Sequence, residues 1–99
     1  MNAQTEAQFT AAVREYAMLC GWRYYHTHDS RRSDPGFPDC VLVRGERLIF
    51  AELKLDKARS KPTEAQEAWL TALALLPTPW VRVCVWRPSD WPSIEEMLR

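Results

Sequence analysis

Glu52 and Lys54 are the two charged residues in the otherwise apolar run LIFAELK at positions 48–54. Side chains alternate between the faces of a β-strand, so this spacing predicts an acid and a base on one face. Charged groups are costly to bury unless they are paired or bound to a ligand. The pattern indicates either a simple ion pair on a half-exposed strand or a site that uses both charges.

A second carboxylate is expected beside this pair. Asp39 follows Pro38, and Gly45 lies six residues further on, where it suits a tight hairpin turn. Counting outward from Gly45 places Asp39 roughly opposite Glu52. Two carboxylates can hold a hard divalent cation such as Mg²⁺. Such a cation polarises a phosphate and activates water, and a nearby lysine stabilises the developing charge, so these residues suit phosphodiester hydrolysis.

The elements that hold these residues follow from periodicity and helix-capping patterns. The sequence TEAQ occurs at 5–8 and again at 63–66, and it has the form of a capping box at a helix start. Alternating or aromatic-rich runs predict strands. The expected elements are a helix over 6–20, strands over 22–27, 39–43 and 47–55, a helix from Thr63 that ends before Pro77, a strand over 80–86, and a closing helix opened by a third capping-box pattern at 93–96.

This order predicts an α/β fold in the sequence αβββαβα. A helix between the third and fourth strands suits a right-handed crossover, so these two strands should be parallel neighbours, and the hairpin pair should be antiparallel. We therefore expect a mixed four-stranded sheet flanked by helices. At 99 residues the chain has the length of one domain, 1–99.

The motifs and their order resemble the PD-(D/E)XK nuclease superfamily, and within it the stand-alone phage and bacterial type of the VRR-NUC family. The resemblance rests on GFPD at 36–39, a hairpin, FAELK at 50–54, and Gln66 followed by Trp69 on the next helix. It covers nearly the whole chain and implies a restriction-endonuclease-like core.

The resemblance also implies roles for residues of the strand pair. Asp39 and Glu52 would bind Mg²⁺ or Mn²⁺ together with the backbone carbonyl of Leu53, and Lys54 would be catalytic.

Two further residues match the family, but each of them also has an ordinary structural explanation. Gln66 corresponds to the glutamine that the family places near the active site, but it is also the third position of a capping box. Glu6 stands where the family often carries an acid that reaches the metal, but an acid in a first turn also complements the helix dipole.

The function implied by the resemblance is a metal-dependent DNA endonuclease that is selective for branched or Holliday-junction-like DNA. A homodimer would match its two sites to the two strands that are cut. The alternative is a non-catalytic nucleic-acid-binding module of the same fold. A third reading is a small α/β interaction protein without a nucleic-acid role.

Charge neither requires nor forbids a nucleic-acid partner. The 13 basic and 13 acidic residues cancel, which argues against an indiscriminate nucleic-acid binder. Positions 31–61 nevertheless hold eight basic and five acidic residues. Solvated loops explain this segment nearly as well as a binding surface. The candidate DNA-binding residues are Ser30, Arg31, Arg32, Lys57, Arg59, Ser60 and Lys61.

The cellular location is expected to be the cytoplasm, of a bacterial cell or of a phage host. The chain has no apolar run near the roughly 20 residues of a membrane span, and its first residues lack a secretory pattern. Its three cysteines, Cys20, Cys40 and Cys84, form no Cys-x-x-Cys pair and suit reduced thiols.

Overall fold

The computed structural model describes residues 4–27 and 32–99. In this part of the chain, four strands form one sheet in the order β1-β2-β3-β4. The strands are β1 (Arg23–His26), β2 (Cys40–Arg44), β3 (Arg47–Leu53) and β4 (Val81–Trp86). The β2–β3 hairpin is antiparallel and β3 and β4 are parallel, as the element order predicted, and β1 pairs antiparallel with β2.

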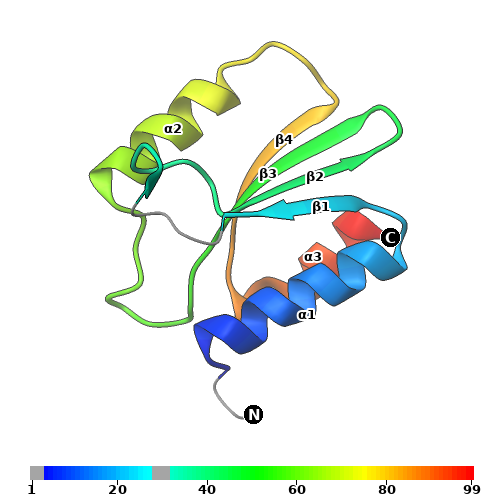
Figure 1. Cartoon of the computed structure of the whole chain (residues 1–99), viewed down its shortest axis with the longest axis horizontal. Helices are drawn as coiled ribbons and strands as arrows, with labels where there is room; N and C mark the ends of the chain where they lie inside the picture. Colours follow the sequence, from blue (N-terminus) through cyan, green and yellow to red (C-terminus); the bar gives the residue numbers. More distant parts are fainter. Residues whose placement is uncertain (1–3, 28–31) are drawn as a thin grey trace.

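The helices lie on both sides of this sheet (Figure 1). Helix α1 (Glu6–Leu19) and helix α3 (Trp91–Leu98) lie on one side, and helix α2 (Glu64–Ala74) lies on the other. A short 3₁₀ helix, η2 (Pro88–Asp90), leads into α3. The predicted mixed α/β fold with a four-stranded sheet is confirmed for the described residues.

The hydrophobic core lies between the sheet and the α1–α3 side. Thr5 and Gln8 form the predicted capping box of α1, and the buried residues of this helix recur every four positions. Burial of such an apolar stripe stabilises a helix that would be marginal in isolation. The fully buried hydrophobic residues are Phe9, Val13, Ala17, Cys40, Leu42, Ile49, Ala51, Ile94 and Leu98.

The closing helix begins earlier than predicted. It starts at Trp91, so Ser93 lies inside the first turn and the predicted capping box at 93–96 is wrong. Pro92 sits in the first turn, where its missing N–H leaves no hydrogen bond unmade. Asp90 precedes the helix, but its carboxylate accepts from the backbone N–H of Arg87 at 2.9 Å and does not cap α3.

Helix α2 carries several apolar residues, but none of them is fully buried. It is attached to the sheet by one tight approach and one aromatic cluster. A Cβ on Gly36 would lie 2.5 Å from the backbone C and O of Ala65, so the chain before β2 packs closely on the start of α2. Phe37 makes edge contacts with Phe50 of β3 and Trp69 of α2, at centroid distances of 5.9 and 5.1 Å.

The structure bears on the expected absence of a membrane span and on the expected reduced cysteines. None of the helices in 4–27 and 32–99 has the length and hydropathy of a membrane span. The cysteines Cys20, Cys40 and Cys84 are free thiols.

Candidate active site

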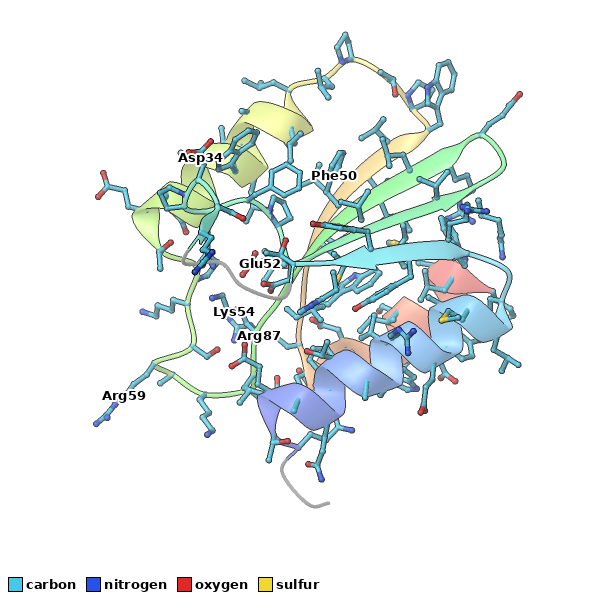
Figure 2. All side chains as sticks on the ribbon, viewed as in Figure 1. Asp34, Phe50, Glu52, Lys54, Arg59 and Arg87 are labelled. Carbon is cyan, nitrogen blue, oxygen red and sulfur yellow. The ribbon has the colours of Figure 1, made fainter. Side chains whose placement is uncertain are left out.

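The predicted acidic pair and the lysine meet where β3 ends. Glu52 lies near the C-terminal end of β3, and Lys54 lies just beyond it. Both are between α1 and α2 (Figure 2). The Glu52 side chain is 1 % exposed, and its Oε2 lies 3.5 Å from the Lys54 Nζ. Its other oxygen, Oε1, is buried without a hydrogen-bond partner among the described residues. A buried carboxylate with one unpartnered oxygen is costly, so either a proton shared with Asp39 or a bound ligand is expected there.

Asp39 reaches this site from the start of β2. Cys40 pairs with Ala51, and the same register brings Asp39 opposite Glu52, as the count around Gly45 predicted. The Asp39 Oδ2 accepts a hydrogen bond from the backbone N–H of Leu53 at 2.8 Å. In an extended strand, the N–H and C=O of one residue point to the same edge. The Leu53 carbonyl therefore faces the side of β3 on which Asp39 lies.

The two carboxylates disfavour each other's charge. Burial, and after it the neighbouring Asp39 carboxylate, raise the pKa of Glu52 to about 8, against the opposing effect of Lys54. A bound cation would offset both causes, because it replaces the lost hydration and neutralises the repulsion.

Cys40, which follows Asp39, offers no alternative nucleophile. Burial raises the pKa of its thiol to about 12, and its Sγ lies 3.4 Å from the Tyr24 hydroxyl. A thiol that stays protonated at neutral pH is inert, so the chemistry of this site rests on oxygen and nitrogen groups.

A cleft of about 1150 Å³ opens onto these residues. It brings together six predicted site residues, including the two that had ordinary structural explanations: Glu6, Asp39, Glu52, Leu53, Lys54 and Gln66. Gln66 also forms the predicted capping box, since its Oε1 accepts from the backbone N–H of Thr63 at 2.8 Å. Its carboxamide oxygen is therefore committed to the cap, and a role toward a ligand would fall to its Nε2 group.

The donor set suits a hard cation such as Mg²⁺ or Mn²⁺ better than a softer metal such as Zn²⁺. Within 4–27 and 32–99, no group of three or more His, Cys, Asp and Glu side chains is placed to hold a metal. Two carboxylates and a backbone carbonyl are hard oxygen donors. Mg²⁺ commonly uses one or two carboxylates and takes its other ligands from water and substrate phosphates. Asp39, Glu52 and the Leu53 carbonyl fit that pattern.

The candidate DNA-binding residues that the structure describes lie outside the lining of this cleft. Arg32, Lys57, Arg59 and Lys61 are exposed, and Ser30 and Arg31 lie outside the described residues. The Ser60 Oγ accepts from the backbone N–H of Leu55 at 3.0 Å, so this side chain also has a structural role.

The segment after Lys54 is tied to the region between β4 and α3. Asp56 accepts from the backbone N–H and the hydroxyl of Ser89 at 2.9 and 2.7 Å. The Arg87 guanidinium donates to the carbonyl of Leu55, and the Lys54 N–H donates to the Trp86 carbonyl at 2.9 Å. These bonds hold the chain at Lys54 and at the two residues after it, and so limit where its ammonium group can move.

Two exposed aromatic residues in the cleft were not predicted as site residues. Tyr25 and Trp69 line it and remain 60 % and 38 % exposed. The alternation along β1 could have indicated Tyr25, because Tyr24 points to the core and Tyr25 must then point to the α2 side. Trp69 entered the sequence analysis only as the residue that follows Gln66 in the resemblance.

Comparisons of the chain with known protein families, with curated proteins and with solved structures found no match. The functional proposal rests on the residues and geometry of the cleft and on the motifs in the sequence.

Proposed function

We propose that this protein is a Mg²⁺- or Mn²⁺-dependent DNA endonuclease that hydrolyses phosphodiester bonds. The observation that carries the proposal is the buried Glu52 carboxylate, which has an unpartnered oxygen beside Asp39 and a lysine 3.5 Å away. The resemblance to the VRR-NUC family, with its restriction-endonuclease-like core, supports the same reading.

Asp39, Glu52 and the Leu53 carbonyl would hold the cation. When bound, it would polarise the scissile phosphate and lower the pKa of the attacking water. Asp39 is oriented for this role because its Oδ2 is fixed by the Leu53 N–H, which leaves Oδ1 and the remaining lone pairs of both carboxylates for ligands. Glu6 lies in the same cleft and is the further candidate for the metal environment.

Lys54 would act on the substrate. Its ammonium group is partly buried beside Glu52, with 17 % of the side chain exposed, so it is held near the place where the phosphate must lie. A positive charge there stabilises the negative charge that builds up in the transition state, or orients the attacking water. Gln66 would contribute its Nε2 group as a hydrogen-bond donor from the start of α2.

Branched or Holliday-junction-like DNA is the proposed substrate, and a homodimer is the proposed assembly. Two copies would offer two cleavage sites to two strands. Arg32, Lys57, Arg59 and Lys61 would contact the backbone outside the cleft, since exposed cations bind phosphates without reading sequence. The free thiols suit a reducing compartment, so the cytoplasm is the proposed location.

Cleavage of labelled four-way-junction, flap, duplex and single-stranded DNA, with and without Mg²⁺ or Mn²⁺, tests this function. We expect metal-dependent cutting by the wild type and none by Lys54→Ala, whose folding is checked by circular dichroism. Tight binding of DNA without cutting of any substrate would favour the non-catalytic binding module. Neither binding nor cutting would favour an interaction protein.

A further inference from the structure

A row of aromatic and apolar side chains leads across the α2 side of the sheet to the proposed metal site. Tyr25 pairs with Val41, and Val41 pairs with Phe50, so these three side chains lie side by side on one face. Glu52 follows Phe50 by two residues and therefore shares that face. Phe37 continues the row from Phe50 to Trp69 on α2.

The two ends of this row are accessible in the cleft. Tyr25 and Trp69 both line it and are exposed, while Phe37 and Phe50 between them are half-buried. Phe37 holds the Trp69 ring edge-on at 5.1 Å, so the position of that ring is set without a ligand. Large aromatic side chains left exposed beside the buried Glu52 carboxylate call for a ligand with flat, apolar faces.

The charge of the described lining offers little attraction for phosphates. Its described lining includes four carboxylates, those of Glu6, Asp34, Asp39 and Glu52, and a single lysine, Lys54. Phosphates alone would be repelled by this lining except at a bound cation. Stacking on bases needs no positive charge and accepts any base, because every base has a π-face.

We propose that Tyr25 and Trp69 form a stacking surface for unpaired DNA bases next to the cleavage site. The substrate strand then enters the cleft as a single strand, with its phosphate at the cation that Asp39 and Glu52 would hold and its bases on the aromatic rings. Paired and stacked bases within a duplex cannot use this surface. This inference rests on the proposed nuclease function and narrows its branched substrate to DNA with a single-stranded or locally unpaired segment at the branch.

Binding of two oligonucleotides with equal charge tests the stacking surface directly. Fluorescence anisotropy in Ca²⁺ would compare a labelled oligothymidylate of about ten nucleotides with an abasic strand of the same length. We expect the oligothymidylate to bind at least about tenfold more tightly, and Tyr25→Ala and Trp69→Ala each to remove about tenfold of that affinity. Tyr25→Phe and Trp69→Phe keep a ring and should retain most of it.

Trp80→Ala is the matched control. Trp80 is 57 % exposed but lies by the β2–β3 hairpin, outside the cleft, so its loss should leave the affinity unchanged. Equal binding of the two strands by the wild type would overturn the stacking surface, as would unchanged binding by folded Tyr25→Ala and Trp69→Ala.

The cleavage assay separates the two proposals. If the aromatic variants lose affinity but no DNA is ever cut, the stacking surface stands and the nuclease proposal fails. If cutting requires Asp39 but proceeds equally in the aromatic variants, the nuclease stands and the stacking surface is wrong.

Discussion

The Asp39 Oδ2 accepts a hydrogen bond from the backbone N–H of Leu53 at 2.8 Å. A side chain thereby continues the β2–β3 ladder where the backbone pairing ends at Cys40 and Ala51. This bond fixes the first carboxylate against the strand that carries the second one, Glu52. The metal site is therefore built partly by the pairing of the two strands.

This bond predicts different results for two substitutions of Asp39. Asp39→Asn keeps an oxygen that can accept from Leu53 and should retain nearly wild-type stability, but it removes a charge and should abolish metal-dependent cleavage. Asp39→Ala also leaves the Leu53 N–H without its partner and should lose about 1–3 kcal/mol of stability. Thermal denaturation and the cleavage assay measure the two effects. Equal stability losses in both variants would mean that the hydrogen bond contributes little.

The raised pKa of Glu52 predicts that the stability of the metal-free protein depends on pH. Its pKa is raised from 4.5 to about 8 in the fold, so the folded chain keeps a proton that the unfolded chain loses. Where the folded state binds more protons, stability falls as the pH rises. For Glu52 this fall is expected between about pH 4.5 and about pH 8. Glu52→Gln has no such proton, so its Tm should rise relative to that of the wild type across this window. Thermal denaturation in EDTA measures the difference, and a pH-independent difference would contradict the assignment.

Substitution of Gly36 by alanine is expected to destabilise the fold strongly, although it adds only one methyl group. Its φ is +95°, and a Cβ would meet the Ala65 backbone at 2.5 Å, so Gly36→Ala combines backbone strain with a clash. We expect a loss of about 3 kcal/mol. Gly45 has φ +59° with nothing within 4 Å of an added Cβ, and Gly45→Ala should lose only about 1 kcal/mol. Chemical denaturation compares the two, and similar losses would show that the approach of α2 is not tight.

Loss of the Arg44 side chain is expected to lower stability without changing the candidate active site. Its guanidinium donates to the carbonyls of Cys20, Leu98 and Arg99 at 2.9–3.1 Å and lies 4.7 Å from the Trp22 ring. Arg44→Ala should lose about 2 kcal/mol, because charged donors to helix-end carbonyls are lost together. Arg23→Ala, at an exposed position of β1, should change stability by less than about 0.5 kcal/mol. Cleavage per folded molecule should be the same in both variants.

Local signals predicted much of the framework. The first two capping boxes start α1 and α2 as expected, because each side chain bonds within its own turn. The position of Asp39 opposite Glu52 followed from the single turn at Gly45, since strand register is fixed once the turn is fixed. The third capping box failed because Pro92 and the 3₁₀ turn at η2 start α3 two residues earlier.

Contacts between distant segments could not be predicted in this way. The Asp39–Leu53 hydrogen bond, the approach of Gly36 to Ala65 and the burial of Glu52 all depend on how elements pack. The same holds for Trp69, whose helical spacing suited a core residue but whose helix lies off the sheet and leaves it in the cleft. Periodicity shows which face of a helix is apolar, but it does not show how fully another element covers that face.

Binding of Mn²⁺, followed by titration calorimetry at pH 7 in two buffers of different ionisation enthalpy, tests the central claim most directly. The Asp39–Glu52 site predicts saturable binding with release of a proton, because Glu52 must ionise to bind the cation. Folded Asp39→Asn and Glu52→Gln should lose this binding, and Arg23→Ala should keep it. Absence of binding by the wild type, or unchanged binding by both carboxylate variants, would contradict a metal site at these residues.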